Sequence, residues 1–185
     1  MLKLKKTKNK MKTLNIKFIA LTLILLLTGV NSYSQITKAE IIATGLTCSM
    51  CSNAINKQLK AFTEVDSIST DLNTNTFTVY FKKDNSLEPK VLKKAVEKAG
   101  FFVGSLVLTA KFHVDKIEDN TTLKIDDATY TFIDIKKPVA HAEGKYRVLD
   151  KGFVTQKEYK KLLKSYSKYP DYATENENDY YLKAL

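Results

Sequence analysis

The sequence predicts an α+β protein, and the order of its apolar patterns carries that prediction. Between residues 36 and 108, four short segments have the apolar pattern of strands, and two others repeat apolar residues at helical spacing. Their order is strand, helix, strand, strand, helix, strand. Two strand–helix–strand halves of this kind form a ferredoxin-like βαββαβ sandwich, with two helices on one face of an antiparallel sheet. Residues 109–185 follow a different pattern of short strands and one helix.

The first half begins with a strand over residues 36–44, which Gly45 ends. Its alternating apolar residues are Ala39, Ile41 and Ala43. A helix follows from residue 52, because its apolar residues fall on one face: Ala54, Ile55, Leu59 and Phe62. Strands are predicted over residues 65–72 and 76–81. The turn Asn73-Thr74-Asn75 joins them as a hairpin.

The second helix is predicted to begin near Pro89, because proline suits the first helical turn. Its apolar stripe consists of Val91, Leu92, Ala95, Val96 and Ala99. Gly100 is a suitable C-terminal stop. Residues 101–108 then form the last strand, which completes a domain over residues 36–108.

Residues 109–169 are predicted to form a smaller β-rich domain that ends in a helix. Short strands are expected at residues 111–114, 121–125, 129–135 and 146–149. They suggest a small β-barrel, for which the OB type is one candidate. Thr155 and Glu158 fit a capping box, and the helix behind them has an apolar stripe of Tyr159, Leu162, Leu163 and Tyr166. Residues 170–185 are polar, acidic and tyrosine-rich, and we expect a flexible tail.

The N-terminus has the composition of a secretory signal peptide. Seven lysines precede an apolar run over residues 18–27, and small residues lie just before Gln35. The apolar run is shorter than the roughly 20 residues of a transmembrane helix. We therefore expect residues 1–34 to be cleaved, which leaves a periplasmic protein without membrane insertion. Met11 is an alternative start, and an uncleaved N-terminal anchor is the rival interpretation.

Most of the net positive charge of the chain lies in this N-terminal segment. The full chain has a formal charge of +10, but the residues from Gln35 onward contain 23 basic and 20 acidic side chains. Such a balance is typical of an ordinary solvated surface. We therefore do not expect nucleic acid as a partner.

The two cysteines of the chain, Cys48 and Cys51, form a Cys-x-x-Cys pair. Such a pair is able to close a disulfide, exchange electrons or hold a soft metal ion. A disulfide between the two cysteines would stabilise the fold little, because the loop that it closes is very short. The pair is therefore predicted to have a chemical role.

The residues around the pair resemble those of heavy-metal-associated domains, the copper-chaperone-like modules also found in metal-transporting ATPases. The run Gly45-Leu46-Thr47-Cys48-Ser49-Met50-Cys51 is similar to the Gly-Met-Thr-Cys-x-x-Cys signature of the family. The run Val96-Glu97-Lys98-Ala99-Gly100-Phe101 resembles the end of the family's second helix. The resemblance covers residues 36–108. It implies that Cys48 and Cys51 are metal ligands, that Gly45 and Thr47 shape the loop, and that Phe101 screens it.

Soft thiolates suit Cu(I) and also hold Zn(II). Mercury and silver are further candidates. Cys51 is expected at a helix N-terminus, where unpaired N–H groups and the helix dipole favour a thiolate. Two ligands leave the ion under-coordinated, so it can pass to another thiol pair. We therefore expect a metal-transporting ATPase or efflux component with its own thiol site as partner, in metal transport, transfer or detoxification.

Four further side chains, which lie near the pair or are of metal-binding type, need an interpretation. Leu46 replaces the usual methionine of the family and keeps its apolar support role. Met50 lies between the cysteines, where a solvent-facing side chain is favoured over a third copper ligand. His113 and His141 are candidates for auxiliary ligands, but an isolated histidine in a strand or loop is more often ordinary polar surface.

Two other functions stay open. An envelope thiol–disulfide oxidoreductase would use the same pair, although the chain has no tryptophan and no proline beside it. A metal-sensing adaptor would dock to a transporter through residues 109–185. No Ser/His/Asp set, carboxylate pair or phosphate loop is visible, so we expect no enzyme. In an oxidising envelope the pair is also expected to need bound metal or a reducing partner to stay active.

Overall fold

The computed structural model describes residues 34–46, 49–140, 143–174 and 176–185. The predicted signal peptide lies outside these residues, except for Ser34, with which the first strand begins. The elements of the first half are β1 (Ser34–Thr44), α2 (Ser49–Leu59), β2 (Val65–Asp71), β3 (Thr76–Phe81), α3 (Pro89–Lys98) and β4 (Phe102–Phe112). This order confirms the predicted βαββαβ pattern.

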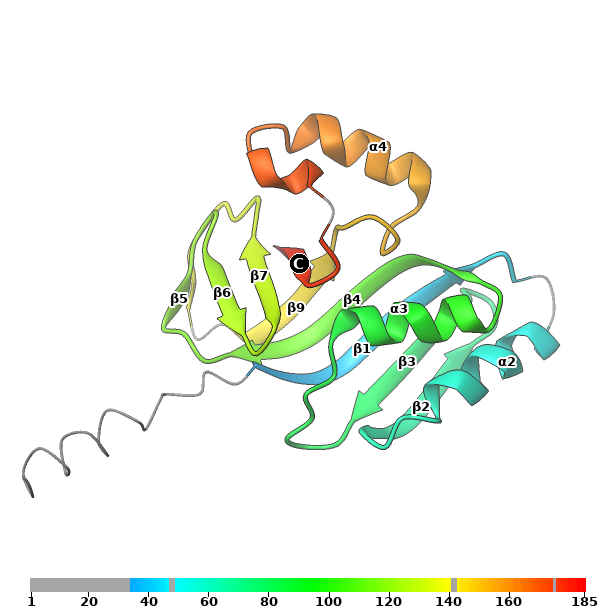
Figure 1. The fold of residues 1–185 in the computed structure, drawn as a ribbon. Coiled ribbons are helices and arrows are strands. Elements are labelled where there is room, and N and C mark those ends of the chain that lie inside the picture. Colours follow the sequence, from blue (N-terminus) through cyan, green and yellow to red (C-terminus); the bar gives the residue numbers. More distant parts are fainter. Residues whose placement is uncertain (1–33, 47–48, 141–142, 175) are drawn as a thin grey trace, which may run out of the picture. The chain divides into compact units, whose positions relative to one another are not determined.

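The strands of the first half form an antiparallel sheet in the order β2-β3-β1-β4. Helices α2 and α3 lie side by side over one face of it (Figure 1). The alternating residues of β1 and β3 that face these helices are fully buried, and Leu92 and Val96 of α3 complete the layer. The amphipathic patterns therefore correspond to one continuous hydrophobic core.

Of the six later strands in the described residues, four extend the same sheet. The six are β5 (Lys116–Ile117), β6 (Thr122–Ile125), β7 (Ala128–Phe132), β8 (Val139–Ala140), β9 (Glu143–Val148) and β10 (Asp179–Ala184). The eight-stranded sheet has the order β2-β3-β1-β4-β9-β10-β7-β6, and β5 pairs with β8 apart from it. The expectation of an OB-type barrel is therefore wrong. Strand β4 is long, and its pairing with β9 satisfies the backbone N–H and C=O groups that an edge strand would leave exposed.

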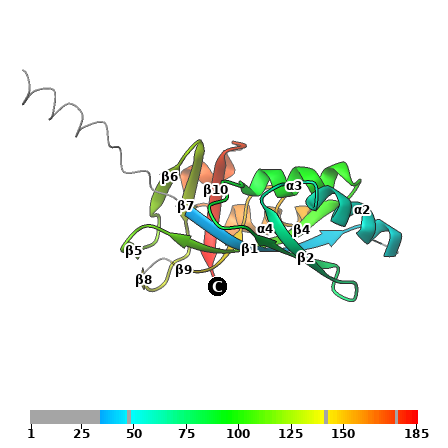
Figure 2. The ribbon, with the colours of Figure 1, turned by 90° about the horizontal axis from the view of Figure 1, so that it is seen from below.

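The C-terminus is not the flexible tail that its polar composition suggests. Strand β10 lies between β9 and β7, antiparallel to the first and parallel to the second (Figures 1 and 2). Tyr180 and Leu182 are buried in the main core, whereas Tyr181 faces the opposite side of the strand. The prediction failed because the polar residues before Asp179 mask a short apolar segment that lies inside a sheet.

Helix α4 (Gln156–Ser165) begins where the capping box predicts. The Oγ1 atom of Thr155 accepts a hydrogen bond from the Glu158 backbone N–H at 3.2 Å. Together with the short 3-10 helix η1 (Pro170–Ala173), α4 forms a second hydrophobic cluster on the Tyr181 side of β10. This cluster is rich in tyrosine: Tyr159, Tyr166, Tyr169, Tyr172 and Tyr181. Among the helices of the described ranges, none has the length and hydropathy to cross a membrane.

Candidate metal site

The loop between β1 and α2 depends on Gly45. Its φ angle is +88°, a left-handed conformation that glycine adopts without steric cost. A Cβ atom placed there would lie 3.8 Å from Cδ1 of Phe101. The next residue, Leu46, is partly buried against the main core. The structure thus explains why the chain has a glycine and then an apolar residue before the cysteine pair.

Cys51 lies in the first turn of α2, as the sequence predicts. Its side chain is partly buried, between the exposed Met50 and the buried Ser52. The first backbone N–H groups of a helix have no partner within the helix, and Cys51 lies among them. Thr47 and Cys48, the other predicted members of the loop, lie outside the described residues.

Met50 does not face the protein interior. Its side chain is 79% exposed. This exposure agrees with the preferred interpretation of Met50 as a solvent-facing residue.

Phe101 is placed beside the loop by the end of α3. Gly100 has a φ angle of +91° and donates its N–H to the Glu97 carbonyl, while the Phe101 N–H reaches the Val96 carbonyl at 3.2 Å. This glycine-terminated turn ends the helix and directs the chain into β4. Phe101 is consequently partly buried against the core, next to Gly45.

His113 does not join this site. His113 follows β4 directly, whereas Phe101 precedes it, so the length of the strand separates His113 from the loop by roughly 30 Å. His141 lies outside the described residues. Within the described ranges, no three His, Cys, Asp or Glu side chains come together in a way that would hold a metal ion.

One neighbour of the site was missed from the sequence. A Cβ atom on Gly104 of β4 would lie 2.5 Å from Cγ2 of Thr44 and 3.8 Å from Cγ2 of Thr155. Gly104 thus leaves room for the Thr44 side chain of the paired strand β1, whereas the distance to Thr155 of α4 is an ordinary contact. A glycine inside a strand pattern is the signal that predicts such a close approach.

Comparison with known proteins identifies the first half of the chain. Residues 40–102 match the family model of the heavy-metal-associated domain, and this portion of the chain is such a domain. Comparison with curated proteins gives no match.

Solved structures similar to this chain include a copper transporter domain, a Cu(I)-containing complex and a metallochaperone. The yeast copper transporter domain Ccc2a is 34% identical over a region that covers 35% of this chain and 88% of the Ccc2a chain, with a TM-score of 0.32. The Atx1–Cu(I)–Ccc2a complex is 29% identical over 43% of this chain and 97% of the matched chain, also with a TM-score of 0.32. The CopZ metallochaperone is 22% identical over 36% of this chain and 98% of its own, with a TM-score of 0.34.

Proposed function

We propose that this chain is an exported soft-metal-binding protein that holds Cu(I) through Cys48 and Cys51 for transport, transfer or detoxification. The observation that carries the proposal is the position of Cys51. It lies partly exposed in the first turn of α2, inside a heavy-metal-associated domain. Mercury, zinc and silver ions are the other soft ions that such thiolates would accept.

The residues around the pair have distinct tasks in this proposal. Gly45 lets the loop turn, and the first turn of α2 positions Cys51. Phe101 lies beside Gly45 at the start of the loop, and the side chain of Met50 is exposed to solvent. An open two-sulfur site permits ligand exchange with a partner, which a closed four-ligand zinc site would hinder.

The location and partner belong to the same proposal. We infer export through residues 1–34, a periplasmic location, and metal exchange with a metal-transporting ATPase or efflux component that carries its own thiols. In this location the cysteine pair requires metal or a reductant to avoid oxidation. A count of reduced thiols in intact cells tests this requirement, and a fully oxidised pair with unimpaired metal handling would contradict it.

Titration of the reduced protein with Cu(I) in the presence of a competing chelator tests the binding itself. We expect one tightly bound ion, which the double variant Cys48→Ser, Cys51→Ser loses. Met50→Leu is the matched control, since it preserves an apolar side chain between the cysteines and should retain the affinity. Equal affinity in the double serine variant would refute the proposal. Turnover in an insulin-reduction assay would favour an oxidoreductase instead.

A further inference from the structure

A groove of about 780 Å³ lies between the metal-binding domain and α4. Its walls come from both halves of the chain. The ends of β1 and β4 contribute Thr44 and Phe102, and the second half contributes Lys151, Tyr159, Lys160 and Leu163. Phe102 is 69% exposed, although it is a large apolar side chain. Val103, Val154 and Leu163 line the same groove, so Phe102 belongs to an apolar surface suited to a protein contact.

The groove begins next to the candidate metal loop. Thr44 pairs with Phe102, and its hydroxyl donates to the Phe102 carbonyl at 3.3 Å. Gly45 follows Thr44 in the chain, and Phe101, which packs beside Gly45, precedes Phe102. A partner seated in the groove would therefore reach the loop that bears the cysteines.

The α4 wall of the groove is held in place by defined contacts. Arg147 of β9 and Glu158 of α4 form two contacts of 2.8 Å, a bidentate ion pair. Thr155 caps the helix and lies beside Gly104. Because these contacts fix the helix before any partner arrives, little ordering is needed when a partner binds.

The exposed surface of α4 is basic. Lys157, Lys160 and Lys164 are exposed and spaced three and four residues apart, so they form one stripe along the helix. None of the three has an ion-pair partner among the residues that the structure describes. Glu158, the acidic residue of the helix, is neutralised by Arg147. The groove itself is lined by Lys151 and Lys160 against one acidic side chain, Glu97. Together with the basic stripe, its apolar floor is therefore complementary to an acidic surface that presents an apolar side chain.

We infer that this groove docks an acidic, thiol-bearing protein partner during metal exchange, and that residues 109–185 supply its docking wall. This inference rests on the proposed function. In the exchange Cu(I) is neither oxidised nor reduced. A copper–thiolate bond to Cys51 forms as one to a partner thiolate breaks, and the released thiolate takes up the proton that the Cys51 thiol loses.

A synthetic peptide tests the inference with the full-length chain. The peptide carries Cys-x-x-Cys loaded with Cu(I), a leucine and four glutamates, and a tryptophan whose fluorescence reports copper loss; the chain itself has no tryptophan. A second peptide has glutamine at each glutamate. At low salt we expect copper transfer from the acidic peptide to be about tenfold faster, because complementary charge accelerates association.

The variants separate docking from metal binding. Lys160→Glu with Lys164→Glu should abolish the advantage of the acidic peptide, and Leu163→Asp should slow transfer from both peptides. Lys124→Glu, which reverses one charge at an exposed position of β6, should retain the advantage, whereas Lys160→Glu alone, with the same charge change, should reduce it. The equilibrium Cu(I) affinity against a chelator should be unchanged in every variant.

Three results would overturn the inference. One is an equal rate of copper transfer from both peptides to the wild type. Another is a loss of the acidic peptide's advantage in Lys124→Glu that is as large as in the α4 variants. The third is self-association in sedimentation that Leu163→Asp abolishes, which would assign the groove to a second copy of the chain. Absence of Cu(I) affinity in the wild type would instead refute the proposed function.

Discussion

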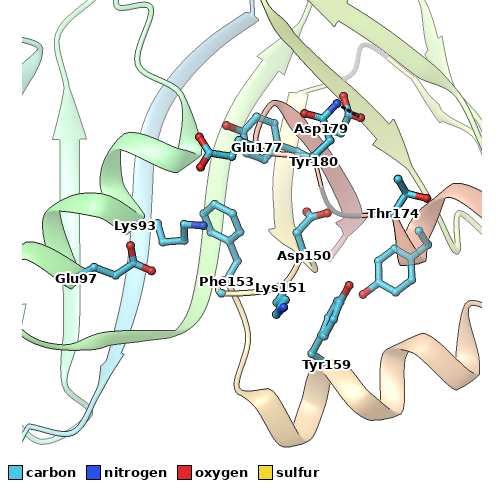
Figure 3. A pocket seen from close by; sticks show the side chains of 13 residues that line it. Lys93, Glu97, Asp150, Lys151, Phe153, Tyr159, Thr174, Glu177, Asp179 and Tyr180 are labelled. Carbon is cyan, nitrogen blue, oxygen red and sulfur yellow. Dashed lines mark hydrogen bonds between the residues drawn. The ribbon is translucent and has the colours of Figure 1, made fainter.

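Asp150 is expected to make the stability of this protein fall as the pH rises from about 4 towards neutrality. The residue follows β9 and is partly buried at a cavity of about 450 Å³ (Figure 3). Its Oδ2 atom accepts the Tyr181 backbone N–H at 2.8 Å. Burial raises the pKa of the carboxyl to about 7, and the hydrogen bond from Tyr181 offsets only part of that rise. Lys93, the nearby cation, lies over the ring of Phe153 at 5.2 Å.

The sign of the effect follows from the direction of this shift. The pKa of Asp150 is about 7 in the folded protein, against 3.8 for an ordinary aspartate. Between these values the folded state binds more protons than the unfolded state, so the free energy of unfolding falls as the pH rises. At about 1.4 kcal/mol per pH unit, the loss between pH 5 and pH 7 is about 3 kcal/mol. This is an upper limit, because the carboxylate is partly exposed to solvent and therefore screened.

The substitution Asp150→Asn removes the titration and retains an oxygen for the Tyr181 N–H. Urea unfolding at pH 5, 6, 7 and 8 should show that the variant is close to the wild type at pH 5 and more stable than it at pH 8. Glu97→Gln is the matched control, because Glu97 lines the same cavity but is exposed, and it should leave the profile unchanged. Asp119 and Asp134 have lowered pKa values, so their contributions change only at more acidic pH. Parallel profiles for Asp150→Asn and the wild type would refute the reasoning.

Three further substitutions test the packing of the fold by urea unfolding. Leu182→Ala in β10 should lower the free energy of unfolding by about 2–5 kcal/mol, because the Leu182 side chain is fully buried. Leu185→Ala should change it very little, because the Leu185 side chain is exposed. Equal effects would mean that β10 is not part of the core. Gly45→Ala should lower the free energy of unfolding by about 1–2 kcal/mol, because the φ angle of Gly45 is +88°. Gly144→Ala should be tolerated, because Gly144 has no positive φ and no close neighbour. A larger loss of stability in Gly144→Ala than in Gly45→Ala would contradict the loop geometry. Tyr172→Phe should lower the free energy of unfolding by about 1–3 kcal/mol, because the Tyr172 hydroxyl donates to the buried Leu149 carbonyl at 2.7 Å. An unchanged urea midpoint in this variant would exclude that hydrogen bond.

Local patterns predicted the elements whose determinants lie within one segment. The alternation over residues 76–81 coincides with β3, and Pro89 begins α3. Thr155 caps α4, and Gly100 ends the turn that places Phe101. In each case the physical cause is an interaction between residues a few positions apart, so it can be read from the sequence directly.

Strand boundaries were less accurate where one pattern runs on without a break. Residues 101–108 and 111–114 were predicted as separate strands, but Phe102–Phe112 is a single strand. Its burial alternates along most of its length, and no turn residue interrupts it. Pairing with β1 on one side and β9 on the other stabilises it as one unit.

The sequence by itself determined the amphipathic elements of the first half, the conformational requirement at Gly45 and the helical position of Cys51. Only the tertiary structure decided where the second half lies. The parallel pairing of β10 with β7 joins residues about fifty positions apart, and α4 packs across β9 and β10. Such contacts depend on which sheet edge and which apolar face are left unfilled once the rest of the chain has folded. No local pattern contains that information, and the groove beside the metal loop follows from it.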